Sequence, residues 1–548
     1  MSSNRSASRS ASRSASNAAF DPTTLEVLWT RLRSVTDEAA KVIVRTSFST
    51  LSIEANDYSC VLTDAHGNSL AQNTASIPSF IATLPATVRH MIAAIGASNM
   101  REGDIYITNN PWKGTGHLND VSLVKPVFLA GGLVAFAATT SHVPDIGGRI
   151  RSAEPREIFE EGFHIPPMRL LQAGTPDESL LLLLRTNVRT PDQTVGDIFA
   201  QASALGLMEA RVRELMNDHA LTDLEALGAQ LFGLAENAMR AAIATVPEGT
   251  YRHAFDSDGL ESPFNFEVAV TVRNGEILAD FAGTSPQQPR AINCVLAYTY
   301  AMTAYAIKAA LLPDLPNNEG MFRPIKVVAP DGCLLNPRHP ASTGGRAATG
   351  HYVPPLIYGA LAQVIPERLM AAPGSPLWIF TVAGVRADGK SFANVFFYNG
   401  GMGATAQKDG EPAVSWPSNI SSTPSEIVER DTPFITHYKR LRPGSGGAGQ
   451  FRGGLGQELL LENRHPTPLP IVFITERLKF PAPGLAGGGA GALGEVLVNG
   501  QPLVDARAQV ILAKGDTLLL RTPGGGGFGE ASSRDPGAIE RDRRLGYL

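Results

Sequence analysis

The chain has 548 residues, of which 43% are hydrophobic and 18% charged, a composition that predicts a globular protein of two or three domains. The net charge of -5 argues against nucleic-acid binding, and no apolar run approaches the ~20 residues that a membrane-spanning helix needs. The three cysteines lack CxxC spacing, so neither a disulfide framework nor a thiolate zinc site is expected, and a reducing, cytoplasmic location fits.

Residues 1–20 form a low-complexity tail of Ser-Ala-Ser-Arg steps, with no acidic residue before Asp21. Such a composition buries too little apolar surface to offset the entropy of ordering, which predicts disorder. A start rich in serine and arginine also resembles an organelle transit peptide, and this alternative stays open.

Residues 21–246 are predicted to form an N-terminal α/β domain. Asp21 and Pro22 suit an N-cap and a first helical position, and apolar residues at three- and four-residue steps predict an amphipathic helix that ends near Ser47. The other elements expected here are strands over 58–62 and 104–108, and helices over 83–95, 191–217 and 221–245.

Two histidine–aspartate clusters flank a predicted β-hairpin in this domain. The first cluster is Gly116–Asp120 and the second is Ser141–Asp145. Between them, apolar strands are expected over 121–129 and 133–140, joined by a tight turn at Ala130-Gly131-Gly132.

The register of this hairpin is predicted to place Asp120 opposite His142. Paired residues in a hairpin have a constant sum of residue numbers, here near 262 because the turn centres on about Gly131. Their β-carbons would then lie ~5 Å apart, close enough to share one metal ion. His117 is an odd number of residues from Asp120, so it must reach the same place from the Gly114–Gly116 turn.

His117, Asp120 and His142 together offer two imidazoles and one carboxylate. This set suits zinc, manganese or ferrous iron and leaves positions open for water or substrate, which favours a catalytic metal. The alternative for each residue alone is a hydrogen-bonded loop histidine or a capping aspartate.

The remaining chain is divided at two changes of pattern. Pro247-Glu248-Gly249 opens a central α/β domain over 247–440, with alternating strands over 251–281, a hairpin at Asn274-Gly275 and an apolar helix over 294–312. Residues 441–548 are glycine-dense and predict a β domain of short strands and tight turns. The predicted fold class is therefore α+β and multidomain.

Gly524, Gly526 and Gly529 match the GxGxxG pattern of dinucleotide sites. Only about twenty residues follow them, too few for the helix and the parallel strand that such a site needs. No cofactor-binding loop is therefore expected in this chain.

Short segments spread along the chain carry a family resemblance. They are 57–60 (DYSC), 103–112 (GDIYITNNPW), 114–120 (GTGHLND), 187–191 (NVRTP), 196–197 (GD), 442–447 (RPGSGG), 451–454 (FRGG) and 522–526 (TPGGG). Together they resemble the hydantoinase B / 5-oxoprolinase B-type subunit family, which also includes subunits of acetone and acetophenone carboxylases and of caprolactamase.

The resemblance implies one component of an ATP-dependent hetero-oligomer. In the family, a separate hydantoinase A-type, ATP-binding subunit phosphorylates the amide or carbonyl oxygen of the substrate, and the B-type subunit holds a divalent metal. In related carboxylases a His-x-x-Asp pair and a later histidine bind the metal, at positions that correspond to His117, Asp120 and His142. Asn110 departs from the family, where an aspartate is frequent, and so does 372–378, which replaces a His-Gly-Thr-like stretch.

The leading hypothesis is ATP-driven hydrolysis of a small cyclic amide: a hydantoin, 5-oxoproline or a lactam. One zinc or manganese ion would lower the pKa of a bound water. Asp57 is a candidate general base, or a local hydrogen-bonding residue. Asp145 is a candidate fourth ligand or a group that orients an imidazole, or a turn cap. A ketone carboxylase component and a non-catalytic scaffold remain alternatives.

Other polar residues carry less weight. Arg149 and Arg151 either contact a phosphorylated substrate or simply solvate the surface. Three further histidines are expected to be structural or exposed: His164, His339 and His351.

Overall fold

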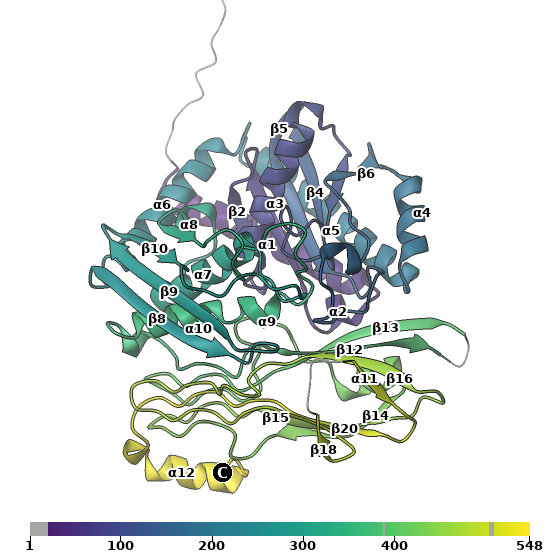
Figure 1. The fold of residues 1–548 in the computed structure, drawn as a ribbon. Coiled ribbons are helices and arrows are strands. Elements are labelled where there is room, and N and C mark those ends of the chain that lie inside the picture. The colour runs from purple at the N-terminus through teal and green to yellow at the C-terminus, as the bar shows by residue number, and fades with distance from the viewer. Residues whose placement is uncertain (1–19, 387–388, 504–508) are drawn as a thin grey trace, which may run out of the picture.

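Four β-sheets and the helices packed on them make up the described chain in this computed structural model, which covers residues 20–386, 389–503 and 509–548 (Figure 1). The predicted α+β, multidomain fold class is confirmed. Apart from Phe20, the tail at residues 1–20 lies outside the described residues. Within those ranges, no helix combines the length and the apolar character that crossing a membrane requires.

The first sheet has seven antiparallel strands in the order β2-β1-β5-β4-β3-β6-β7. These strands are β1 (Tyr58–Asp64), β2 (Ser69–Gln72), β3 (Ile105–Thr108), β4 (Asp120–Leu129), β5 (Gly132–His142), β6 (Met168–Gln172) and β7 (Thr175–Pro176). The helices of this region are α1 (Pro22–Thr46), α2 (Thr50–Ile53), α3 (Phe80–Ile95), α4 (Glu178–Asn187), α5 (Pro191–Asp218) and α6 (Glu225–Ile243). As predicted, Asp21 caps α1 by accepting hydrogen bonds from two backbone N–H groups, and Ser47 is its C-cap.

Helices cover both faces of this sheet. Leu123 and Ala137 point to the face under α1 and α5, whereas their neighbours Val124 and Phe136 pack on the opposite face under α3. Because both faces are buried, a shift of one residue in strand pairing would move every side chain to the wrong layer. The β4–β5 register is therefore strongly specified.

A bulge in the β4–β5 hairpin sets its register. The turn residues Ala130 and Gly131 both have positive φ, 49° and 82°, and Leu129 pairs with Gly132. An unbroken ladder from this turn would place Asp120 opposite Ser141. The register shifts by one residue beside Val127, and Asp120 pairs with His142 as predicted.

The second sheet has the order β11-β10-β9-β8. Its strands are β8 (Gly249–Ser257), β9 (Phe264–Arg273), β10 (Glu276–Asp280) and β11 (Ile325–Val328). The predicted hairpin at Asn274-Gly275 is confirmed. The helices here are α7 (Leu296–Leu311), α8 (Glu319–Phe322), α9 (Ala347–Gly350) and α10 (Val353–Leu361). Helix α7 contacts both α10 and α3. Arg346, just before α9, bonds Asp120 at the start of β4, so this loop lies against the first sheet.

Two further sheets pack on each other through an aromatic core that includes Phe380, Phe396 and Phe473. Their orders are β13-β12-β16-β19 and β14-β15-β20-β17-β18. The strands are β12 (Trp378–Val385), β13 (Ser391–Tyr398), β14 (Phe434–Leu441), β15 (Gln457–Asn463), β16 (Leu469–Ile474), β17 (Glu495–Val498), β18 (Gln501–Pro502), β19 (Val510–Leu512) and β20 (Thr517–Arg521), with helices α11 (Ser425–Asp431) and α12 (Pro536–Leu545). The sequence predicted a domain boundary between residues 440 and 441. The first of these sheets spans it, because β12 and β13 come before the boundary and β16 and β19 come after it.

The expected short strands are present in residues 441–548, from β15 to β20, but the glycine-rich segments lie outside these ladders. They run side by side and bond backbone to backbone (Figure 1): the Gly454 amide donates to Met402, the Gly525 amide to Gly454 and the Gly447 amide to Gly525, at 2.7–3.0 Å. A β-carbon on Gly401 would lie only 1.8 Å from the Gly454 carbonyl oxygen. The glycines therefore permit backbones to pack at a distance that no side chain allows.

Candidate metal centre

The structure brings His117, Asp120 and His142 together at the open end of the β4–β5 hairpin. His117 Nε2 lies 2.7 Å from Asp120 Oδ1, and His142 Nδ1 lies 3.2 Å from the same oxygen. One ligand atom from each of these residues lies within 4.8 Å of the others, and all three side chains are about 1% exposed. His117 reaches this place from the turn at Gly116, whose φ is 110°, as the spacing required.

The protonation of these groups fits a divalent cation. Burial and then the charge of Arg346 lower the pKa of His117 well below its ordinary value. Burial and the charge of Arg151 lower the pKa of His142 to about 4. Burial alone would raise the pKa of Asp120, but Arg346 and His117 outweigh it and hold that pKa well below its usual range. Neutral imidazoles and an ionised carboxylate are the forms that bind metal.

The second ring nitrogen of His117 has a backbone partner of the kind found at metal sites. Its Nδ1 lies 3.1 Å from the carbonyl oxygen of Gly344, which can accept a hydrogen bond from a protonated Nδ1 and so leave Nε2 as the ligand atom. Glu161 fixes this loop: its Oε1 accepts hydrogen bonds from the Ser342 hydroxyl and from the amides of Thr343 and Gly344. The Glu161 carboxylate thus positions the carbonyl that orients His117.

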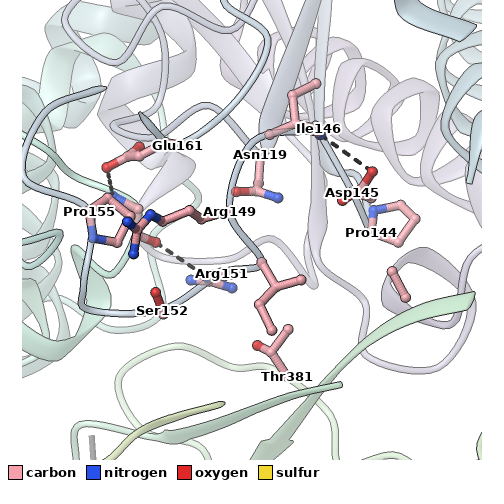
Figure 2. Close-up of a pocket in the computed structure, with 14 residues that line it drawn as sticks. Asn119, Pro144, Asp145, Ile146, Arg149, Arg151, Ser152, Pro155, Glu161 and Thr381 are labelled. Atoms are coloured by element: carbon pink, nitrogen blue, oxygen red, sulfur yellow. Dashed lines mark hydrogen bonds between the residues drawn. The ribbon is translucent and has the colours of Figure 1, made fainter. Parts of the chain in front are cut away.

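Two arginines enclose the centre. Arg346 Nη2 donates to Asp120 Oδ2 at 2.5 Å, and its guanidinium stacks over the ring of Tyr298. Arg151 Nε donates to the Gly344 carbonyl at 3.1 Å, and its Nη1 lies 3.4 Å from His142 Nε2. Arg151 also lines a pocket beside the centre, together with Arg149, Glu161 and Thr381 (Figure 2). Arg151 is therefore built into the centre rather than left to solvate the surface.

The two predicted catalytic aspartates occupy different places. Asp57 Oδ2 lies 3.6 Å from His142 Nδ1, and burial together with the charge of Asp120 raises the pKa of Asp57 to about 7. Asp145 instead lines the pocket of Figure 2, where its carboxylate binds the Arg189 guanidinium at 2.6 Å. It lies outside the cluster of potential ligands, and its contacts favour a role in holding the loop.

Sequence reasoning did not place Arg346 or Glu161 at the centre, and it expected His351 to be structural or exposed. Arg346, Glu161 and His351 each reach it from elsewhere in the chain: Arg346 contacts Asp120, Glu161 holds the Gly344 loop, and His351 lines the same cavity as the two histidine ligands. A glycine-rich stretch before Arg346 was the only local signal. His339, by contrast, packs edge-on against Trp112.

Asp57→Asn is expected to stabilise the metal-free protein at pH 8 more than at pH 5. A carboxyl whose pKa rises from about 4 in the unfolded chain to about 7 in the fold destabilises the folded state progressively as the pH climbs through that window. Asparagine removes this cost, which is about 4 kcal/mol at pH 8, where the carboxyl is ionised in both the folded and the unfolded chain. Urea unfolding with a chelator at both pH values measures it, and an equal effect at both would contradict the raised pKa.

Comparisons with known proteins match nearly the whole chain. The Hydantoinase B/oxoprolinase family model matches residues 21–531. A protein described as a putative D-/L-hydantoinase B-type subunit, from Pseudomonas sp. (strain NS671), is 28% identical over 96% of this chain and 93% of its own length.

Two solved structures are also similar to the chain. The ATP-dependent caprolactamase from Pseudomonas jessenii aligns with a TM-score of 0.86 and 27% identity, over 97% of this chain and 95% of that one. Nucleotide-free acetone carboxylase aligns with a TM-score of 0.87 over 96% of this chain and 78% of that one, and at 19% identity it shares the fold.

Proposed function

The chain belongs to the hydantoinase B/oxoprolinase family, and we propose that it is the metal-binding subunit of an ATP-dependent hydrolase that opens a cyclic amide. The buried set of His117, Asp120 and His142 carries this proposal, because its neutral imidazoles and its carboxylate suit one zinc or manganese ion. The relative described as a B-type subunit supports an A-type partner. We propose that this partner binds ATP and that the two form a cytoplasmic hetero-oligomer.

Each group at the centre has a distinct task in this reaction. Ring amides resist water because resonance stabilises the carbonyl, and phosphorylation on the partner subunit would activate that carbon. A bound divalent ion lowers the pKa of water and so supplies a nucleophile near neutral pH. Asp57, with a pKa of about 7, would take the proton of the attacking water. Arg151 and Arg346 would balance the negative charge of the phosphorylated oxygen.

A ketone carboxylase component is the second candidate. The fold shared with acetone carboxylase favours it, and the same two arginines would accept a phosphorylated enolate or carboxyphosphate. Such a reaction requires bicarbonate, whereas ring opening requires only water and ATP. The two candidates therefore differ in their co-substrate.

The test is an assay of the chain copurified with its A-type partner, with ATP and hydantoin, 5-oxoproline or caprolactam. We expect phosphate release that depends on the cyclic amide and on both subunits, with negligible turnover by this chain alone. Phosphate release that depends on a ketone and bicarbonate would establish the carboxylase instead. Full activity of the isolated chain would contradict the division of labour between two subunits.

A further inference from the structure

The two carboxylate oxygens of Asp120 have different surroundings. Oδ1 faces the candidate ligand atoms, 2.7 Å from His117 Nε2 and 3.2 Å from His142 Nδ1. Oδ2 instead accepts hydrogen bonds from the hydroxyl of Thr115 at 2.6 Å and from Arg346 Nη2 at 2.5 Å. A carboxylate oxygen has two lone-pair positions, so these two bonds fill Oδ2. Oδ1 is therefore the oxygen of Asp120 that is open to a metal ion.

Both donors to Oδ2 are held by close packing. Thr115 is 1% exposed and lies in the Gly114–Gly116 turn, where a β-carbon on Gly116 would lie 2.7 Å from Cδ of Arg346. The Arg346 side chain is also buried, and its guanidinium carbon lies 4.8 Å from the centre of the Tyr298 ring. The turn that carries Thr115 is thus packed directly on the second donor. For either donor to leave Oδ2, this packing would have to loosen.

The Thr115 hydroxyl differs from that of an ordinary threonine in a turn. Threonine hydroxyls in turns typically bond a backbone group a few residues away. Among the described residues, the hydroxyl of Thr115 instead bonds only the carboxylate of Asp120, which begins the next strand. A hydrogen bond to an ionised group is about twice as strong as one between neutral groups. Groups that bond the outer side of a metal ligand in this way fix its orientation and tune its affinity for the metal.

We propose that Thr115 is a positioning residue of the metal centre: together with Arg346, it holds Asp120 so that only Oδ1 can bind the ion. His117, Asp120 and His142 would then supply one ligand atom each. A carboxylate that bound through both oxygens would occupy one position more, at the expense of water or substrate. The inference rests on the proposed metal centre, and it holds for any substrate.

Metal affinity tests the role of the hydroxyl. Thr115→Val removes it and keeps the shape of the side chain, whereas Thr115→Ser keeps it. We expect the full chain to lose about 10–100-fold in affinity for Zn²⁺ or Mn²⁺ in Thr115→Val, measured by competition with a chromogenic chelator, and to stay close to wild-type affinity in Thr115→Ser. Equal affinity in Thr115→Val and the wild type, or equal losses in both variants, would overturn the inference. If the wild-type chain binds neither ion, the proposed metal centre itself fails.

The spectrum of bound Co²⁺ separates positioning of Asp120 from simple stabilisation of the turn. In Thr115→Val, Oδ2 has lost one of its two donors, and we expect it to approach the ion. The visible absorption of Co²⁺ should then weaken, because it falls as the number of ligands rises. A variant that binds Co²⁺ less tightly but keeps the wild-type spectrum would show that Thr115 only stabilises the turn.

Thr303→Val is the matched control for this variant. The hydroxyl of Thr303 is also buried, and it donates to the carbonyl of Thr299 at 2.8 Å within α7. We expect the metal affinity and the Co²⁺ spectrum of Thr303→Val to match the wild type. If Thr115→Val does not fold, Thr115→Ala, which also lacks the hydroxyl and is smaller, takes its place in both measurements.

Discussion

His117→Ala in the two-subunit complex is expected to remove the bound divalent metal and, with it, ATP-coupled turnover. The substitution deletes one of three candidate ligands and also the contact between Nδ1 and the Gly344 carbonyl. Loss of a merely supporting group costs about 10–100-fold in metal affinity, so loss of a ligand should cost at least 100-fold. Metal content by plasma mass spectrometry and phosphate release measure the two effects, and the first also identifies the ion.

His465 offers a matched control for this variant. It is also a buried histidine, and its two ring nitrogens lie within hydrogen-bond distance of the backbone carbonyls of Thr467 and Val385. We expect His465→Ala to reduce stability while metal content and turnover per folded complex stay at wild-type levels. Full metal occupancy and full activity in His117→Ala would contradict the proposed centre.

The hairpin shows how far local sequence information reaches. The pairing of Asp120 with His142 could be predicted because two short strands and a turn limit the possible registers. The prediction placed the turn centre at Gly131, whereas the turn consists of Ala130 and Gly131 and a bulge supplies the missing residue. The register was right for a reason that the sequence pattern did not reveal, since a bulge depends on packing against both faces of the sheet.

The rest of the centre could not be predicted in this way. Arg346 meets Asp120 across 226 residues, and Ser342 meets Glu161 across 181. These contacts depend on how α7 places the second sheet against the first, which periodicity within one element does not determine. His351 is a single histidine after a short helix, and its neighbours in sequence contain no motif. A side chain of this kind is recognised only when the cavity around it is known.

The C-terminal region shows a different limit. Its glycine content predicted a separate β domain of short strands and tight turns, but glycine is equally compatible with turns and with close backbone packing. The choice between them is made by segments far apart in sequence, because the carbonyl of Met402 accepts from Gly454 and that of Gly454 from Gly525. Long-range pairing likewise joins β12 to β16 across the predicted boundary at residue 441.

Gly401→Ala is expected to destabilise the packed glycine layer strongly. Its β-carbon would lie 1.8 Å from the carbonyl oxygen of Gly454 and 2.9 Å from the amide of Gly525. Both obstacles are backbone atoms, and the Gly454 carbonyl already accepts a hydrogen bond from Gly525. Relieving this clash therefore requires the backbone segments to move apart. We expect the free energy of unfolding to fall by at least about 3 kcal/mol, the upper range for overpacking.

The matched control for Gly401→Ala is Gly206→Ala. Gly206 lies in α5, where a β-carbon would meet no atom within 4 Å, and alanine is the better helix former by about 1 kcal/mol. The two variants should therefore shift the urea unfolding midpoint in opposite directions. If Gly401→Ala does not fold, soluble yield beside that of Gly206→Ala gives the same ranking. If Gly401→Ala were as soluble and as stable as the wild type, the close backbone packing at Gly401 would be contradicted.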